Sequence, residues 1–238
     1  MLQRVRTLLQ MIRFSHTLFA LPFALLSALL AWQKPGSFHL LDLIGILLCM
    51  VFARSTAMAF NRLADRSFDA ANPRTAQRHL VTGQLTPSAV WVFTLCCAMG
   101  FLLSTLLFWI SPNQNLWPTH LSVPVLLFVC GYSFTKRFTA LSHFWLGASL
   151  LLAPLAAWIA IRGLEELAVP GVLGLAVLSW VAGFDILYAC QDVDFDRRAG
   201  LFSVPAQVGV PASLRIALLC HMVMIILLVA LAWVAAPL

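Results

Sequence analysis

Acidic side chains at helical spacing occur at two places in this sequence. The first is AFNRLADRSFD, in which Asn61, Asp65 and Asp69 are four residues apart. On a continuous α-helix a step of four advances the direction by only about 40°, so these side chains lie on one face, ~6 Å apart along the axis. Carboxylates at that distance can share oxygen atoms bound to a metal. The spacing predicts a site for a hard cation.

The second acidic stripe lies in FDILYACQDVDFD. Its polar members share one helical face through steps of three and four: Asp185, Tyr188, Asp192 and Asp196. Asp194 falls outside the stripe and is expected to be solvated. Two acidic stripes that face each other repel unless cations lie between them. Mg²⁺ is the expected ion, because the donors are oxygen atoms without His or Cys.

Cationic residues accompany both stripes. Tyr132 and Lys136 in GYSFTKRF share a third helical face, with Arg137 beside it. Further cations follow the two acidic stripes: Arg74, Arg78, Arg197 and Arg198. Mg²⁺ readily bridges a carboxylate to a phosphate oxygen, and Arg and Lys bind the remaining phosphate charge. The combination predicts a diphosphate ligand.

One arginine lies apart from these groups. Arg54 precedes Asn61 by seven residues, so it lies two turns deeper on the same helical face. An arginine inside a bilayer is costly and indicates function, here as the partner of an acidic group on a substrate. The alternative is a structural pair with a helix carbonyl or an Asp. Isolated histidines such as His143 and His221, and likewise His16, are interpreted as packing or hydrogen-bonding residues.

The elements that carry these residues are predicted to be membrane helices. Hydrophobic residues make up 61% of the 238 positions and charged residues 10%, which excludes an ordinary soluble domain. Seven apolar runs can each cross a bilayer: 16–33, 40–60, 88–110, 116–134, 142–161, 168–190 and 212–236. We expect an all-α, polytopic transmembrane helical bundle. The net charge of +6 is read as a topology signal and not as a nucleic-acid surface.

Basic residues are distributed unevenly between the two sides of this bundle. Twelve of the fifteen Lys and Arg lie in the N-terminus and in 61–87, 135–141 and 191–215, against Lys34 and Arg162 in the opposite loops. The positive-inside rule then places the N-terminus and all three polar loops in the cytoplasm. The three groups of polar residues therefore converge at the cytoplasmic mouth of the bundle, in a cell inner membrane.

Four segments give the chain a strong resemblance to the UbiA superfamily of intramembrane polyprenyltransferases. NRLADRSFD resembles the first acidic motif of that family and ANPRTAQRHLVTG the Arg-rich loop after it. YSFTK resembles its YxxxK element, and DILYACQDVDFDRRAG its second acidic motif. RFSHTLFALPFALLSALLA and GLFSVPAQVG resemble the 4-hydroxybenzoate polyprenyltransferase-like branch, which includes the prenylating enzyme of the futalosine route to menaquinone.

The resemblance implies roles for individual residues. The ligands of two Mg²⁺ ions would be Asn61, Asp65, Asp69, Asp192 and Asp196, and the contacts to prenyl diphosphate Arg66, Arg74, Arg78 and Lys136. Arg54 would lie near the aromatic acceptor, Asp185 and Tyr188 would line the cavity, and Tyr132 would bind substrate. Members of the family usually have nine helices. Residues 1–238 are therefore expected to form a single transmembrane prenyltransferase domain that lacks the last two.

The function implied is Mg-dependent transfer of a polyprenyl group from prenyl diphosphate to an aromatic acceptor, with release of diphosphate, in ubiquinone or menaquinone biosynthesis. Asp185 is our choice for the base that removes the ring proton. A CDP-alcohol phosphotransferase is an alternative, but its DG and AR pattern is absent from the sequence. A membrane transporter is a second alternative, and its ionisable residues should cluster near the bilayer midplane.

Overall fold

A computed structural model describes residues 2–12, 20–33 and 38–236, and every regular element in these ranges is helical. The helices are α1 (Leu2–Met11), α2 (Leu21–Ala31), α3 (Leu40–Ala64), α4 (Arg66–Ala71), α5 (Pro87–Ile110), α6 (Trp117–Thr135), α7 (Ser142–Arg162), α8 (Ala168–Ala189), α9 (Val193–Arg198), α10 (Val204–Val208) and α11 (Val210–Val234). A 3₁₀ turn, Cys190–Asp192, joins α8 to α9. The prediction of an all-α fold is confirmed.

The seven predicted spans correspond to α2, α3, α5, α6, α7, α8 and α11, with ends that agree to about one turn from residue 40 onward. Within the described ranges, five of these helices are long and apolar enough to cross a membrane, namely α3, α5, α7, α8 (continued through α9) and α11. The described part of α2 is apolar but short. The first turn of α6 carries Pro118, Thr119 and His120, which lowers its hydropathy. Residues 13–19, with His16, lie outside the described residues.

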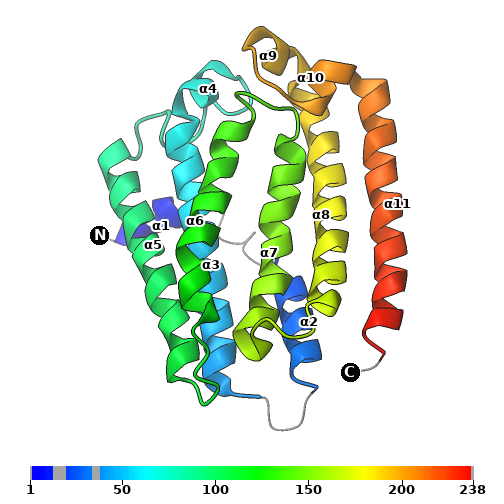
Figure 1. The fold of residues 1–238 in the computed structure, drawn as a ribbon. Coiled ribbons are helices and arrows are strands. Elements are labelled where there is room, and N and C mark those ends of the chain that lie inside the picture. Colours follow the sequence, from blue (N-terminus) through cyan, green and yellow to red (C-terminus); the bar gives the residue numbers. More distant parts are fainter. Residues whose placement is uncertain (1, 13–19, 34–37, 237–238) are drawn as a thin grey trace.

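The long helices pack side by side, and the short elements gather at one end of the bundle (Figure 1). The closest neighbours are α3 with α5, α7 with α8, and α8 with α11, while α2 packs against α7. The apolar core surrounds the fully buried Trp158 and includes Phe108, Leu173 and Ala28. At the end that carries α4, α9 and α10, a smaller cluster packs Met11 against residues of α3, α5 and the loop between α4 and α5.

Close approach between α7 and α8 depends on a glycine. A Cβ atom at Gly147 would lie 2.5 Å from the backbone carbonyl oxygen of Leu178. The helix backbone cannot move away as a flexible side chain could, so this position requires glycine. Small residues let helix backbones come together where no apolar driving force separates protein from lipid. The contact fixes the distance between the two helices that carry His143 and Asp185.

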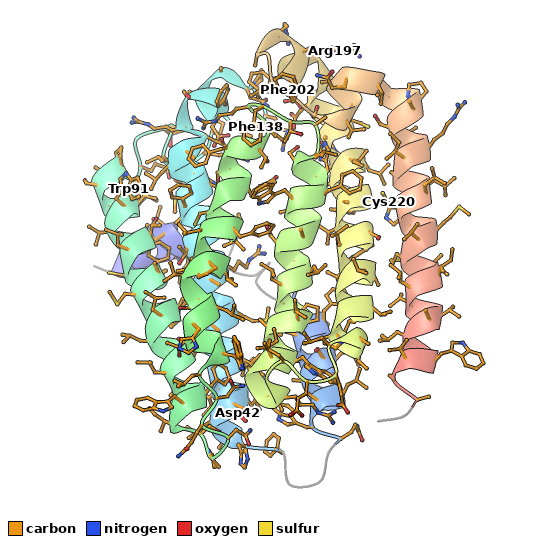
Figure 2. All side chains as sticks on the ribbon, viewed as in Figure 1. Asp42, Trp91, Phe138, Arg197, Phe202 and Cys220 are labelled. Carbon is orange, nitrogen blue, oxygen red and sulfur yellow. The ribbon has the colours of Figure 1, made fainter. Side chains whose placement is uncertain are left out.

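The connections differ strongly between the two ends of the bundle. At one end, α4 and the loop to residue 86, the α6–α7 turn and the segment 190–209 are polar, and Figure 1 shows them together. At the other end the α5–α6 and α7–α8 connections are short. Asp42 lies at this second end, opposite Phe138, Phe202 and Arg197 (Figure 2). The predicted convergence of the three polar loops at one end is therefore confirmed.

Candidate active site

The sequence analysis predicted one continuous helix for the first acidic motif, and this prediction is wrong. Helix α3 ends at Ala64, and Asp65 has φ −96° and ψ 9° before α4 begins. Arg137 from the α6–α7 turn donates to the carbonyl oxygen of Ala64 at 2.6 Å. That oxygen would accept from Phe68 in an unbroken helix, so a side chain replaces the backbone donor. Asp69 N still donates to Asp65 O at 2.8 Å, which keeps both side chains near one face.

Hydrogen bonds hold the end of α3 against α6. Asn61 Nδ2 donates to Asp65 Oδ2 at 2.7 Å and lies 3.4 Å from Ser133 Oγ of α6. The guanidinium of Arg137 lies 3.5 Å from Asp65 Oδ1 and stacks over the ring of Phe134. Burial, followed by the nearby charge of Asp69, raises the pKa of Asp65, and the bonds from Asn61 and Arg137 oppose this rise only in part.

The loop after α4 returns its arginines to the acidic motifs. Thr75 Oγ1 donates to the carbonyl oxygen of Asp69 at 3.0 Å, and the side chain of Asn72 accepts from Arg74 N at 2.9 Å. These two bonds form a tight turn. Arg78 Nη1 then reaches both carboxylate oxygens of the buried Asp69, at 2.5 and 2.6 Å.

The same turn joins the first motif to the second. Arg74 Nε donates to Asp192 Oδ1 at 2.9 Å, and its Nη2 donates to Oδ2. Asn72 Nδ2 also reaches Asp192 Oδ1, at 3.2 Å. The hydrogen bond to Asp192 raises the pKa of Arg74 above its ordinary value. Side chains separated by about 120 positions in the sequence therefore form one polar cluster.

The second motif departs from the predicted straight stripe in the same way as the first. Helix α8 ends at Ala189, and the 3₁₀ turn and α9 redirect the chain. As a result Asp192 and Asp196 are buried while Tyr188 is half exposed. Asp194 is exposed, as the sequence analysis expected. Asp196 Oδ2 is buried and has no hydrogen-bond partner among the described residues.

The Tyr132 and Lys136 pair lies between the two motifs. Tyr132 lies near enough to Asp65 and Asp185 to interact electrostatically with both. Lys136 interacts electrostatically with Asp192. The carbonyl oxygen of Lys136 accepts a hydrogen bond from Phe202 N at 2.7 Å, so the α6–α7 turn and the segment before α10 are connected. Arg74 also lies over the ring of Tyr188, at 5.7 Å from its centroid.

Asp185 is held by a partner that the sequence analysis did not assign to the site. His143 Nδ1 lies 2.7 Å from Asp185 Oδ2, and its Nε2 accepts from Val204 N at 3.2 Å. His143 is completely buried. The interpretation of His143 and His221 as hydrogen-bonding residues is confirmed, since His221 Nδ1 bonds to the carbonyl oxygen of Ala217.

Two predicted site residues lie apart from the polar cluster. Arg54 is in the middle of α3, and its buried Nε has no hydrogen-bond partner in the described part of the chain. Arg66 is exposed and lines a shallow hollow with Leu63, Ser67 and Val81. None of the ion pairs found among the described residues joins Arg66 to Asp69 or Asp192.

Sequence reasoning missed Asn72, Arg137 and His143 as site residues. Asn72 has a usable signal, because it lies three residues after Asp69 and precedes a proline, where a side-chain turn is common. Arg137 follows Lys136 in the sequence, but its bond to the carbonyl oxygen of Ala64 joins the α6–α7 turn to α3, which no local pattern shows. Nothing in the sequence pairs His143 with Asp185, which is 42 positions away.

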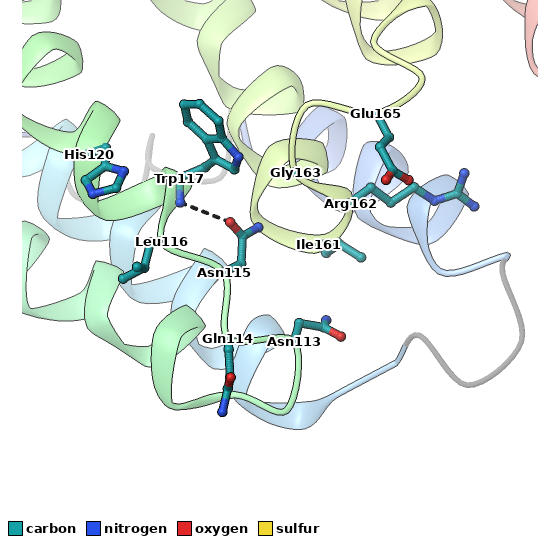
Figure 3. Close-up of a pocket in the computed structure, with 10 residues that line it drawn as sticks. All are labelled: Asn113, Gln114, Asn115, Leu116, Trp117, His120, Ile161, Arg162, Gly163 and Glu165. Atoms are coloured by element: carbon teal, nitrogen blue, oxygen red, sulfur yellow. Dashed lines mark hydrogen bonds between the residues drawn. The ribbon is translucent and has the colours of Figure 1, made fainter.

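A second pocket lies at the opposite end of the bundle, with a volume of about 620 Å³ (Figure 3). Its lining includes Asn113, Asn115, Trp117 and Arg162. Arg162 is already bound to Glu166 and to the carbonyl oxygen of Ala31. Asn115 likewise donates to the carbonyl oxygen of Ile159. This pocket has no acidic motif, so we assign the chemistry to the other end.

Oxygen atoms dominate the polar cluster and make it suitable for a hard cation. No group of three His, Cys, Asp or Glu side chains in the described ranges is gathered closely enough to enclose a metal ion by itself. Arg74 and Arg78 instead hold the carboxylates of Asp192 and Asp69. The unpartnered oxygen of Asp196 and the absence of sulfur and imidazole from the donor set fit Mg²⁺ with additional ligands from a phosphate.

Known proteins share both this sequence pattern and this fold. Residues 20–238 match the model of the UbiA prenyltransferase family. The chain belongs to the UbiA prenyltransferase family. A relative from Histophilus somni, a 4-hydroxybenzoate octaprenyltransferase, is 36% identical over 166 residues, which cover 68% of this chain. The match spans 55% of the length of that relative. The resemblance drawn from the motifs is confirmed.

Solved structures of UbiA homologues superpose on this bundle. The apo structure of a UbiA homologue from Aeropyrum pernix K1 has a TM-score of 0.85 and 34% identity, and covers 93% of this chain and 80% of its own. A UbiA homologue from Archaeoglobus fulgidus, bound to DMAPP and Mg²⁺, has a TM-score of 0.73 and 21% identity. That match covers 94% of this chain and 77% of the homologue. The apolar helices and the family together make this chain a multi-pass membrane protein.

Proposed function

We propose that this chain transfers a polyprenyl group from prenyl diphosphate to an aromatic acceptor and releases diphosphate. The acceptor is 4-hydroxybenzoate or a related, futalosine-derived compound, and the reaction belongs to quinone biosynthesis. The observation that carries the proposal is the connection of two acidic motifs through Arg74, Asn72 and Asp192 at one end of an apolar bundle. The 4-hydroxybenzoate octaprenyltransferase from Histophilus somni supports the choice of acceptor.

Mg²⁺ is the proposed cofactor. The residues that would hold it are Asn61, Asp65, Asp69, Asp192 and Asp196, and the unpartnered Asp196 oxygen fits such a ligand. When bound, Mg²⁺ stabilises negative charge on a departing diphosphate. The binding of DMAPP and Mg²⁺ by the Archaeoglobus fulgidus homologue supports this choice of cofactor.

Cationic side chains of the chain itself would bind and orient the diphosphate. Arg74 and Arg78 lie at the cluster, Lys136 acts on Asp192, and Arg66 is proposed to contribute from the neighbouring helix. Donors fixed in advance around the leaving group stabilise its charge as the allylic C–O bond breaks. The electron pair of that bond stays on the diphosphate. The apolar helices below exclude water that would capture the allylic carbon.

The acceptor is proposed to lie deeper in the bundle, beside Arg54, Tyr132, Asp185 and Tyr188. Arg54 has a buried Nε without a hydrogen-bond partner among the described residues, which suits the acidic group of 4-hydroxybenzoate. The aromatic ring attacks the allylic carbon and then loses a proton. Asp185 is the proposed acceptor of that proton.

Product analysis tests the proposal. Purified protein in lipid vesicles is incubated with geranyl diphosphate, Mg²⁺ and either 4-hydroxybenzoate or a deoxyfutalosine derivative. We expect release of inorganic diphosphate together with a prenylated aromatic product, detected by mass spectrometry. Release without any prenylated acceptor would identify a diphosphatase, and absence of both would remove the proposed function.

We also propose that residues 1–238 form one transmembrane prenyltransferase domain of a cell inner membrane, with the N-terminus and the active site facing the cytoplasm. The charge bias between the two sets of loops supports this orientation. Single thiols introduced at Ser88 and Ala199, in a variant without the native cysteines, should react only with a reagent supplied from the cytoplasm. A thiol at Asn113 is the control for the opposite side. Labelling of Ser88 and Ala199 from different sides contradicts the shared site.

A further inference from the structure

We propose that His143 is a positioning residue that orients Asp185 to accept the ring proton of the aromatic acceptor. The inference rests on the proposed function and adds a residue to it. His143 is the first-turn residue of α7, Asp185 lies in the last turns of α8, and Val204 begins α10. Three elements therefore meet at one imidazole ring.

Both ring nitrogens of His143 are occupied. Nδ1 lies 2.7 Å from Asp185 Oδ2, and Val204 N lies 3.2 Å from Nε2. The imidazole is fully buried, while the side chain of Asp185 is 23% exposed. Ile186, which follows Asp185, packs with Val204 and Ala217 in a buried apolar cluster. The ring is therefore bound to fixed protein groups on both sides.

These partners determine which tautomer His143 adopts. A backbone N–H can only donate, so Nε2 must carry a lone pair toward Val204. The proton of the neutral ring then lies on Nδ1 and is donated to Asp185. In a doubly protonated ring, the proton on Nε2 would point at the N–H of Val204. That N–H cannot turn away, because the backbone fixes its direction. The assignment follows from the hydrogen-bond network.

The neutral donor distinguishes Asp185 from the other acidic residues of the site. Asp69 and Asp192 are each held by a guanidinium that occupies both carboxylate oxygens. Asp185 is held by an imidazole that occupies Oδ2 alone. The bond from His143 fixes Oδ2, so the other oxygen is the one that can approach a substrate.

The position of Asp185 suits a proton acceptor beside the reacting carbons. Asp185 lies in the last turns of α8, one turn before Tyr188 and two turns before Asp192 of the second motif, and its side chain is partly exposed. In the reaction a ring carbon forms a bond to the allylic carbon, and the C–O electron pair leaves with diphosphate. The same ring carbon then transfers its proton to Asp185, and the C–H electron pair returns to the ring.

Two substitutions of His143 separate its two hydrogen bonds. His143→Asn places an amide N–H near the position of Nδ1 and can still donate to Asp185, but it cannot reach Val204. His143→Gln places its carbonyl near the position of Nε2 and can still accept from Val204 N, but it no longer holds Asp185. Both variants are purified in lipid vesicles, and their thermal unfolding is compared with that of the wild type.

Prenyl transfer from geranyl diphosphate to 4-hydroxybenzoate is then measured with Mg²⁺. We expect His143→Gln to lower kcat by about 10- to 100-fold, because an oriented base contributes at least that much. KM for geranyl diphosphate should stay unchanged. His143→Asn should retain clearly more activity than His143→Gln. The double variant with Asp185→Asn should be no slower than Asp185→Asn alone, because the residues act as a unit.

An isotope effect provides a readout that a purely structural role would not change. With 4-hydroxybenzoate deuterated at the ring positions beside the hydroxyl, the wild type should show little effect on kcat, since proton loss follows a slower step. His143→Gln and Asp185→Asn should show a clear normal effect, since proton removal then limits the rate. Activity retained by Gln and lost by Asn, or loss without an isotope effect, would make His143 a structural link to Val204. A wild type that releases no prenylated product overturns the proposed function instead.

Discussion

Charged residues serve different purposes at the two ends of this bundle. At the end with the short loops, Asp42 accepts from Asn113, and Arg162 binds Glu166 four residues away and the last turn of α2. These contacts hold helix ends and the short connections together. At the motif end three arginines pair with three carboxylates across different elements: Arg137 with Asp65, Arg78 with Asp69 and Arg74 with Asp192.

The difference shows which charges the fold needs and which a ligand can use. An ion pair between residues four apart, such as Arg162 and Glu166, contributes little to stability. Pairs that cross between α4, the following loop and the 3₁₀ turn require several chain segments to meet. When a phosphate and its metal ion bind, the phosphate can take the place of the carboxylate beside an arginine, and the metal can take the place of the arginine beside a carboxylate. Substitutions at the two ends should therefore separate activity from stability.

The largest effect is expected at the two acidic motifs. Asp65→Asn or Asp192→Asn keeps the size of the side chain but removes charge that a metal requires, so either should lower turnover by about 100-fold or more. The double variant should be far less than additive, because both act on one bound group. Diphosphate release by the folded, purified proteins is the measurement. Asp194→Asn, at an exposed position outside the cluster, is the matched control.

Near-wild-type turnover of Asp192→Asn would contradict a site built from both motifs, even if Asp65→Asn were inactive. It would also remove the contrast between the ends of the bundle, since the pair with Arg74 would then be structural.

A smaller effect is expected from loss of one diphosphate contact. Arg74→Gln removes a two-pronged bond to Asp192 and a proposed contact to substrate, so KM for geranyl diphosphate should rise by about 10- to 100-fold, the range for charged hydrogen bonds. Titration of initial rates against geranyl diphosphate measures the change. Arg215→Gln, an exposed arginine at the start of α11, is the control. Equal effects of the two variants would assign Arg74 to general surface charge.

Arg54→Ala should affect mainly the acceptor. The side chain has no hydrogen-bond partner at Nε among the described residues, so its removal should raise KM for 4-hydroxybenzoate by about tenfold, as for the loss of one charged hydrogen bond. KM for geranyl diphosphate should remain at the wild-type value. The comparison requires both substrates to be titrated separately. An equal increase in both KM values would place Arg54 at the diphosphate or in the fold.

The smallest effect on turnover is expected at Asp42. Asp42→Ala removes a fully buried side chain that accepts from Asn113, which should lower the free energy of unfolding by about 1–3 kcal/mol. Turnover per folded molecule should stay at the wild-type value, because Asp42 lies at the far end of the bundle. Thermal unfolding and activity are measured on the same preparation. A specific loss of turnover would show that the two ends act together.

Much of the fold and part of the site could be predicted from the sequence. Apolar runs gave the long helices, because burial in lipid is a property of each segment alone. Charge and loop length correctly predicted that the polar loops meet at one end of the bundle. These loops bring together the acidic motifs, Tyr132 and Lys136. The breaks at Asp65 and after Ala189 could not be predicted. The first break accompanies a donor from another helix, Arg137, which no local pattern contains.

The pairings were beyond reach for the same physical reason. The sequence places Arg74 near the motifs, but its pairing with Asp192 and not with Asp69 depends on the turn that Asn72 forms. In the sequence His143 is an isolated polar residue in an apolar run. Its pairing with Asp185 depends on the packing of α7 against α8, which no local pattern contains.

Gly147, where α7 contacts α8, therefore affects the geometry of the proposed base some distance away. Gly147 lies one turn after His143, and Leu178 two turns before Asp185. A methyl group at Gly147 would push against the carbonyl oxygen of Leu178 and separate the two helices. Rigid helices transmit that displacement along their length, so the bond between His143 and Asp185 would lengthen although neither residue had changed. The length of the hydrogen bond between His143 and Asp185 therefore depends on the close backbone contact at Gly147, one turn further along α7.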